Sequence, residues 1–414
     1  SPLPVLLARL PYNKDRPQVL AFSLDRFLEA GYVVVIQDMR GRFASEGEFT
    51  LTLDETRDGI DTIAWIASQP WSNGRVGMFG ASYLGIPQWL AAKGQPPALQ
   101  ALAPMHTQHS LYTNQGGAFE FGLFLGWAIR QGALGEVPRR MREGQATQED
   151  LDAVAQAVAE MQPVYEHLPL TDMPLLRRFA PYYFDWIAQA EDEAARHQRA
   201  EKEIYEQVTV PSLNIGGWYD MFVEGALENY MQMKRYGGSE LARTFPRLLI
   251  GPWAHFDLPG IFPERSYGPQ ASTRDIDLVG IHLRWFDHWL KGIDNGVEEE
   301  KPVRIFVMGD DVWRDEEDWP LPDTKYRRYY LHSQGQANTA AGNGLLLPQA
   351  PGDEPEDVYC YDPHHPVPTL GGANLLQIGT ALNTGPRDQR EIEQREDVLC
   401  YTTPPLTQPL EITG

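Results

Sequence analysis

The strongest constraint on the fold is an alternation of two apolar patterns in the N-terminal quarter of the chain. Residues 3–10 and 32–36 are continuous apolar runs, the second rich in Val and Ile, as in strands covered on both faces. Residues 54–68 instead carry apolar side chains at helical spacing, and residues 75–79 form another short apolar run. Strands that alternate with helices form βαβ units, so the sequence predicts an α/β fold with a parallel sheet.

The pattern changes twice further along the chain. Residues 105–208 have the pattern of consecutive helices, and the α/β pattern resumes at residue 209. An all-helical insertion of this kind usually lies over the active-site edge of a sheet as a cap. From residue 301, short alternating runs separated by Pro, Gly and Asp predict an antiparallel β domain. We therefore predict two core segments, 1–104 and 209–300, a helical cap, 105–208, and a β domain, 301–414.

Composition excludes several classes of protein. The 57 acidic and 35 basic residues give a net charge of −22, a field that repels phosphate backbones and argues against nucleic-acid binding. No apolar run approaches the roughly eighteen residues of a membrane span. Two cysteines cannot form a disulfide framework, so a cytoplasmic location is the default expectation. The chain opens almost directly on an apolar strand, and we expect its natural N-terminus to lie upstream.

A candidate nucleophile lies in residues 80–85, Gly-Ala-Ser-Tyr-Leu-Gly, between a predicted strand and a predicted helix. In a strand-to-helix elbow the serine occupies a strained turn that exposes its hydroxyl, and small neighbours prevent clashes. Gly85 stands three residues after Ser82 rather than two, so the strict motif is not met. The hexapeptide alone leaves both a nucleophile and a chance Gly-x-Ser open.

Two later apolar runs supply the partners that a serine nucleophile needs. Asp220 follows the run ending at residue 215 by five positions, and His255 follows the run ending at residue 250 by five positions. Parallel strands bring their carboxyl ends to one edge of a sheet. A serine nucleophile needs a base there and a carboxylate that orients the base. The order Ser82, Asp220, His255 is that of α/β-hydrolases, and it predicts a catalytic triad.

Other residues could fill the same roles. An aspartate after a strand is often a turn former or a helix N-cap, and Asp257 is a rival to Asp220 as the orienting group. Alternative bases are His106, His109, His282, His288, His364 and His365.

An oxyanion hole needs two hydrogen-bond donors. One would be the backbone N–H of Tyr83, the residue after the nucleophile. The other should come from the loop after an early strand, residues 9–14, where Tyr12 could present its phenol or simply pack.

Five segments, taken in their order along the chain, carry a resemblance to a known family: residues 9–14, 38–47, 80–85, 216–220 and 251–255. They are similar to the motifs of the CocE/NonD serine hydrolases, the superfamily of cocaine esterase, X-Pro dipeptidyl-peptidases, cephalosporin acylases and α-amino acid ester hydrolases. The resemblance extends over nearly the whole chain. In that family the glycine three residues after the serine is the usual form of the elbow.

The resemblance implies an α/β-hydrolase core, a helical cap and a C-terminal β jelly roll, incomplete in this chain. It implies that Ser82, Asp220 and His255 form the triad and that Tyr12 and Tyr83 form the oxyanion hole. No metal or organic cofactor is implied.

Substrate preference is suggested by the residues around these motifs. Trp127 and Phe222 resemble positions that line the aromatic acyl pocket of the esterase branch, although Trp127 could equally pack in the core of the cap. Residues 221–223 are apolar, whereas α-amino acid ester hydrolases carry carboxylates just after the triad aspartate. X-Pro peptidases need acids that bind a free amino terminus, and the candidates are Glu120, Asp172, Asp185 and Glu224.

Three functions are therefore compared. The first is a serine esterase that acts through a Ser82 acyl-enzyme on a small-molecule ester. The second is an X-Pro dipeptidyl-peptidase, or an amide or β-lactam side-chain acylase, with the same triad and a short peptide or amide substrate. The third is a non-catalytic binding protein on a hydrolase core. Homo-oligomer formation stays open.

Overall fold

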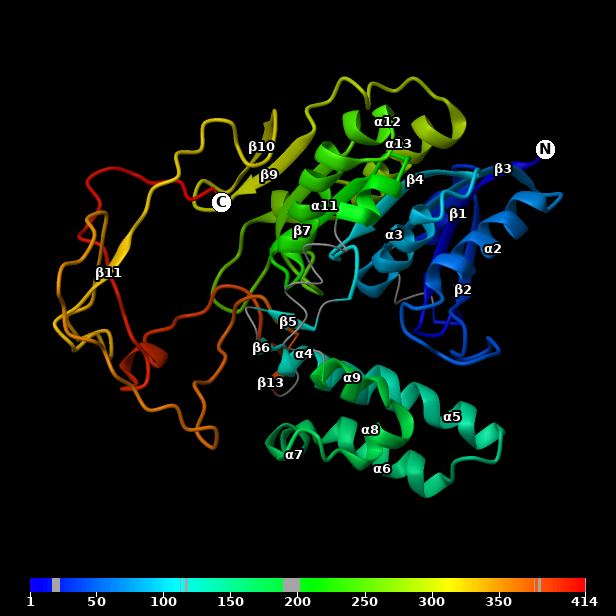
Figure 1. The fold of residues 1–414 in the computed structure, drawn as a ribbon. Helices are drawn as coiled ribbons and strands as arrows, with labels where there is room; N and C mark the ends of the chain where they lie inside the picture. The colour runs from blue at the N-terminus through cyan, green and yellow to red at the C-terminus, as the bar shows by residue number, and fades with distance from the viewer. Residues whose placement is uncertain are drawn as a thin grey trace.

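The computed structural model describes every residue except 17–22, 112, 116–117, 189–201, 376, 379–380 and 414. Its central feature is an eight-stranded sheet with the order β10-β9-β8-β7-β4-β3-β1-β2 (Figure 1). The strand pairs from β2 to β9 are parallel, and β10 is antiparallel to β9. The predicted α/β fold is thus confirmed. The strands are β1 (Leu3–Leu10), β2 (Val33–Asp38), β3 (Ser72–Ala81), β4 (Leu99–Met105), β7 (Leu213–Tyr219), β8 (Arg247–Ala254), β9 (Val303–Val307) and β10 (Val312–Glu316).

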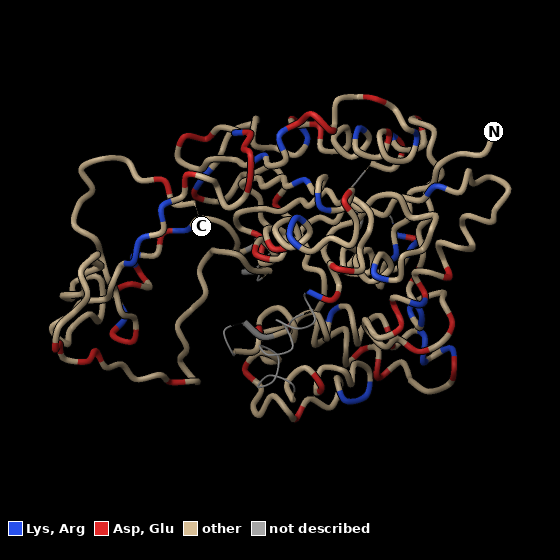
Figure 2. The backbone as a smooth tube through the Cα atoms, turned by 45° about the horizontal axis from the view of Figure 1, so that its top comes forward, with Lys and Arg blue, Asp and Glu red and all other residues tan. Residues whose placement is uncertain are grey.

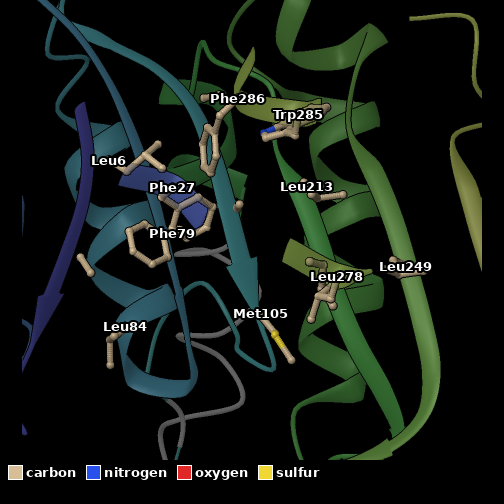
Figure 3. Packing of buried hydrophobic residues seen from close by; sticks show 14 of the residues in the cluster. Leu6, Phe27, Phe79, Leu84, Met105, Leu213, Leu249, Leu278, Trp285 and Phe286 are labelled. Atoms are coloured by element: carbon tan, nitrogen blue, oxygen red, sulfur yellow. The ribbon is translucent and has the colours of Figure 1, made fainter. Parts of the chain in front are cut away.

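Helices cover both faces of this sheet. Because side chains alternate along a strand, Leu6 of β1 packs with one layer of helices and Leu7 with the other. On the Leu6 side, Phe27, Trp285 and Phe286 complete a core that Figure 3 shows at close range. The helices of the first layer are α1 (Leu24–Glu29) and α13 (Leu278–Lys291), and those of the second are α2 (Glu55–Ser68), α3 (Ile86–Lys93), α11 (Val223–Tyr236) and α12 (Glu240–Thr244).

A group of helices lies between β4 and β7 in the chain and has a core of its own (Figure 1). Thr147 and Asp150 form a capping box at the start of α6, where each side chain accepts the other's backbone N–H. The extent of the cap, residues 105–208, stays a prediction. The elements are β5 (Asn114–Gln115), β6 (Ala118–Phe119), α4 (Phe121–Trp127), η3 (Ala128–Ala133), α5 (Leu134–Arg142), α6 (Gln148–Ala159), α7 (Met161–Glu166), α8 (Pro174–Phe179) and α9 (Tyr182–Ala188).

The C-terminal part begins inside the main sheet. The alternating pattern of residues 303–307 predicts a strand of the β domain, yet β9 pairs in parallel with β8 as well as antiparallel with β10. Its inward side chains Val303 and Ile305 are buried beside Leu248 and Ile250, which explains why this strand joins the core. Beyond it, the described residues form the short pairs β11 (Tyr330–His332) with β12 (Leu345–Leu347) and β13 (Gln377–Ile378) with β14 (Ala381–Leu382).

Charge is spread along the molecule. Figure 2 shows acidic residues in the sheet region, in the helices between β4 and β7, and in the C-terminal part. Among the helices that the structure describes, none has the length and apolarity needed to cross a membrane.

The packing of α13 on the sheet leads to a stability prediction. Phe286 is fully buried, and its ring packs against Gly77 of β3, where a Cβ atom would lie 2.6 Å from the ring. Phe286→Ala should lower the free energy of unfolding by about 3–5 kcal/mol, because replacing the ring with the methyl group of alanine leaves a cavity that the sheet cannot fill. Urea denaturation measures this change. Leu410→Ala, at an exposed position, is the matched control and should cost less than about 0.5 kcal/mol; equal losses in both variants would contradict the packing described.

Candidate active site

Ser82 occupies a strained turn at the end of β3. Its φ angle is 61°, in the left-handed region that residues with a Cβ rarely adopt. It opens the 3₁₀ turn η2 (Ser82–Gly85), which leads directly into α3. This strand–turn–helix arrangement is that of a nucleophile elbow, and Ser82 lines an adjacent pocket.

Two glycines allow the chain to pack closely around this elbow. At Gly80, with a φ of 136°, a Cβ atom would lie 2.7 Å from Leu84 Cβ. At Gly85 it would lie 2.1 Å from Cγ2 of Thr107, on the loop after β4. Because the 3₁₀ turn brings the third residue after Ser82 against that loop, the second glycine is needed at this position. This contact is a physical reason for the departure from the strict motif.

Asp220 and His255 directly follow two neighbouring strands. β7 ends at Tyr219 and β8 at Ala254, whereas the sequence pattern placed the strand ends four residues earlier. Pairing continues through Gly217, where a Cβ would come within 2.3 Å of a β8 carbonyl. Glycine has no apolar side chain, so the sequence pattern that predicts the strand stops at this point. The backbone hydrogen bonds between β7 and β8 nevertheless continue.

The two side chains are joined by a short hydrogen bond. His255 Nδ1 lies 2.6 Å from Asp220 Oδ2, and the backbone N–H of Phe222 donates to Oδ1 at 2.6 Å. Burial acts to raise the pKa of Asp220, but the nearby imidazoles of His106 and His255 and the Phe222 N–H outweigh it and hold the pKa below its usual range. Asp220 can therefore stay ionised and fix the orientation of His255.

Tyr12 follows β1, which pairs with β3 on the side away from β4, β7 and β8. Its hydroxyl accepts a hydrogen bond from Trp127 Nε1 at 3.1 Å and interacts with the Ser82 side chain. Burial raises the pKa of Tyr12 to about 12, against the opposing effects of Trp127, Arg42 and Ser82. The phenol therefore keeps its proton at neutral pH, as an oxyanion donor must.

The alternative groups lie elsewhere, with one exception. Asp257 accepts backbone N–H groups of its own loop, those of Gly260 and of Ile261, the latter at 3.4 Å. His106 lies with its Nδ1 3.2 Å from Asp220 Oδ2, so it joins the triad region from a third strand end. The other candidate histidines have partners outside the site: His109 pairs with Tyr205, His282 with the Leu278 carbonyl, His288 with Glu298, and exposed His364 with Asp362. His365 is also exposed, and its backbone N–H donates to the Asp362 carbonyl at 3.0 Å.

The pocket beside Ser82 is lined mainly by apolar and aromatic side chains. Trp127 and Phe222, the two predicted substrate-binding residues, both belong to the lining. Trp127 also stacks on Tyr83, with ring centroids 5.8 Å apart and planes 9° apart. None of the described lining residues is charged, and the four candidate acids are not among them. The full lining is Tyr12, Ser82, Tyr83, Ile86, Thr107, Gln108, Leu111, Leu123, Phe124, Trp127, Trp186, Phe222 and Leu375.

Sequence reasoning missed several of these lining residues. Trp186 comes from α9, and Leu375 comes from the C-terminal part, about 150 residues after Phe222, the lining residue that precedes it in the chain. Neither belongs to a motif or to a recognisable spacing, so only the folded chain reveals them. For His106, one sequence feature indicated a place at the same edge of the sheet: its position directly after an apolar strand.

Comparison with known proteins agrees with the α/β core described above. Residues 1–257 match the family model of the X-Pro dipeptidyl-peptidases (S15 family), and residues 295–414 match their C-terminal non-catalytic domain. The chain therefore belongs to the S15 family, and it is a serine hydrolase.

Individual relatives fit the same assignment. Cocaine esterase of Rhodococcus sp. (strain MB1 Bresler) is 39% identical over 426 residues, covering 100% of this chain and 72% of that protein. Among solved structures, an aminopeptidase from a marine sediment Thaumarchaeota archaeon has a TM-score of 0.70 at 24% identity, covering 98% of this chain and 68% of the other. An α-amino acid ester hydrolase has a TM-score of 0.68 at 23% identity, covering 100% and 69%. These two structures support the fold.

The contact at Gly85 can be tested directly. Gly85→Ala should lower stability by about 1–3 kcal/mol through overpacking against Thr107, and it should also displace Ser82 and reduce ester hydrolysis. Thermal unfolding and the initial rate on p-nitrophenyl butyrate measure the two effects. Gly352→Ala, where an added Cβ meets no atom within 4 Å, is the control and should leave both unchanged. An active, stable Gly85→Ala protein would show that the elbow tolerates a side chain here.

Proposed function

We propose that this protein is an esterase that hydrolyses carboxylic esters with an apolar or aromatic acyl group through a Ser82 acyl-enzyme. The observation that carries the proposal is the uncharged, aromatic-lined pocket beside Ser82. A pocket of this kind favours a neutral acyl group, because burying an unpaired charge there would be costly. The relative named cocaine esterase supports the same substrate class.

Acylation uses the residues gathered at the strand ends. His255 takes the proton of Ser82 at Nε2 while Oγ attacks the ester carbonyl carbon. The oxyanion that forms is stabilised by the Tyr12 hydroxyl and the Tyr83 backbone N–H, at roughly 3–4 kcal/mol for each donor. The tetrahedral intermediate then collapses, the C–O bond to the alcohol breaks, and His255 returns the proton to the leaving alkoxide.

Deacylation repeats the same steps with water. His255 removes a proton from water, the resulting hydroxide adds to the acyl carbon, and the acid leaves as Ser82 recovers its proton. Throughout, the ionised Asp220 holds His255 Nδ1–H at 2.6 Å and stabilises the imidazolium. The helices of residues 105–208 act in this proposal as a cap that supplies the pocket wall opposite the triad.

The family name favours a second candidate, an X-Pro dipeptidyl-peptidase with the same triad. Such an enzyme must bind the free ammonium group of its substrate, for which buried carboxylates are the usual partners. Asp185 lines a neighbouring cleft together with Arg42 and Glu136, and it does not line the pocket of Ser82. The apolar pocket therefore favours the esterase.

The two candidates differ in substrate. Ser82→Ala should lower the hydrolysis of p-nitrophenyl butyrate by more than about a thousandfold, because the nucleophile is lost. The unmodified protein should cleave this ester in strong preference to Ala-Pro-p-nitroanilide, measured by release of the chromophore. Preferred cleavage of the anilide would instead assign the protein as a peptidase. A Ser82→Ala protein as active as the original on both substrates would refute the mechanism.

The role of Tyr12 is tested by removing one oxygen atom. Tyr12→Phe should reduce kcat on p-nitrophenyl butyrate by about 100-fold or more with little change in KM, because the hydroxyl acts on charge that develops in the transition state. Tyr183→Phe is a matched control, since this buried cap tyrosine lies outside the pocket and its hydroxyl has no hydrogen-bond partner among the described residues. Equal kcat values for the two variants would remove Tyr12 from the oxyanion hole.

A further inference from the structure

The loop that follows β2 packs against the loop that carries Tyr12. The backbone N–H of Met39 donates to the carbonyl of Leu10 at 3.0 Å, and the backbone N–H of Lys14 donates to Asp38 Oδ1 at 2.7 Å. These two bonds lie on either side of Tyr12 in the chain. The place of Tyr12 at the edge of the sheet therefore depends on the loop after β2.

Arg42, a residue of that second loop, is a buried cation that donates to backbone carbonyls. Only 2% of its surface is exposed. Its Nε donates to the carbonyl of Pro11 at 3.2 Å, whereas Nη2 and Nη1 donate to the carbonyls of Gln131 and Gly132 at 2.6 and 3.4 Å. Pro11 immediately precedes Tyr12 in the chain, and the other two acceptors belong to η3. One guanidinium thus joins the loop of Tyr12 to the helical layer.

The surroundings of Arg42 fit a guanidinium closely. Its central carbon lies 5.1 Å from the ring centroids of both Phe43 and Phe49, within the range of a cation–π contact. At Gly135 of α5, an added Cβ atom would lie 2.2 Å from Arg42 Nη2. A buried charge is costly unless it is paired and hydrogen-bonded, and the planar fork of arginine can reach carbonyls on two sides at once. The missing side chain at Gly135 leaves the space that this fork occupies.

A second bond connects the same two segments. Trp127 Nε1 donates to the Tyr12 hydroxyl at 3.1 Å, and Trp127 is the last residue of α4, directly before η3. Gln131, which accepts from Arg42, lies about one helical turn beyond Trp127. The η3 segment is a π-helical turn, a rare form that is often found at functional sites. The Tyr12 loop is thus held against the helical layer at its backbone and at its side chain.

We propose that Arg42 is a positioning residue of the oxyanion hole, which fixes the loop of Tyr12 against η3 and thereby aligns the Tyr12 hydroxyl. Arg42 does not belong to the described lining of the Ser82 pocket, so it acts through Tyr12 and not on the substrate. The inference rests on the proposed function, in which the Tyr12 hydroxyl stabilises the oxyanion. It adds a residue from outside the pocket to that machinery.

This role has a kinetic consequence that a purely structural role lacks. The oxyanion develops in the transition state, so a misplaced hydroxyl lowers kcat and leaves substrate binding nearly unchanged. The loss should also depend on the hydroxyl itself. A residue that only stabilises the fold would lower the amount of active protein equally with and without the Tyr12 hydroxyl.

A double-mutant cycle measures this dependence. Arg42→Met keeps an unbranched apolar stem and removes every donor. In the full chain, with p-nitrophenyl butyrate as substrate, it should lower kcat by about 10- to 100-fold and change KM by less than about threefold. In the Tyr12→Phe background the same substitution should lower kcat by less than about threefold further, because no hydroxyl remains to be aligned. Losses that multiply in the double variant, or an unchanged kcat in Arg42→Met, would overturn the inference.

The chain offers a matched control in Arg247, at the start of β8. This arginine is also buried, and it donates to the backbone carbonyls of Pro246, Val297 and Glu298. It lies at the opposite end of β8 from His255. Arg247→Met should leave kcat and KM of the folded protein unchanged, with and without the Tyr12 hydroxyl.

A second variant tests the same contact while the guanidinium is kept. Gly135→Ala places a methyl group where Nη2 lies, so the flexible side chain of Arg42 must move away from its acceptors. It should lower kcat in the same way as Arg42→Met, and it decides the question if Arg42→Met does not fold. An unchanged kcat in Gly135→Ala would also overturn the inference.

Backbone hydrogen exchange, followed by mass spectrometry, gives a readout that does not depend on turnover. Arg42→Met should speed exchange by about tenfold or more in peptides that cover residues 11–14 and 128–135, whereas Arg247→Met should not. Faster exchange in both segments would support the positioning of Tyr12 by Arg42 even if the protein proves not to be an esterase. Unchanged exchange in the two segments would overturn the inference, whatever the substrate of the enzyme.

Discussion

The close parallel pairing of β7 with β8 is the constraint on which the proposed site depends. Gly217 lacks the side chain that would separate the two backbones, so the ladder continues to the last residue before Asp220 and His255. A carboxylate and an imidazole are thereby held 2.6 Å apart, each directly after the end of one of these two paired strands. Ser82 after β3 and His106 after β4 reach the same edge because these strands are also parallel.

Much of this arrangement can be predicted from the sequence. The alternation of strand and helix indicates the sheet, and the order of Ser82, Asp220 and His255 indicates a common edge. What the sequence hides are features set by backbone contacts. The strand ends are concealed by glycine, and β9 resembles a strand of a separate β domain until its neighbours Leu248 and Ile250 are seen. Trp186 and Leu375 enter the pocket wall from distant segments that carry no motif.

The protonation states of the buried groups in the site depend on burial and on the few polar groups that surround each one. Asp220 is fully buried, and it stays ionised because an imidazole pair and one backbone N–H surround it. Tyr12 is also buried, and it keeps its proton because the opposing effects of Trp127, Arg42 and Ser82 do not outweigh burial. The same low-polarity surroundings thus favour opposite protonation states in the two groups, according to the partners that each one meets.

The hydrogen bond between Trp127 and Tyr12 joins the helical layer to the core at the proposed oxyanion hole. Trp127 also stacks on Tyr83, so a single side chain of α4 contacts both residues proposed to stabilise the oxyanion. The wall proposed to select the acyl group and the groups proposed to stabilise the oxyanion are therefore connected through this one side chain. In the proposed mechanism, a displacement of α4 would therefore change the pocket wall and the oxyanion-hole residues together.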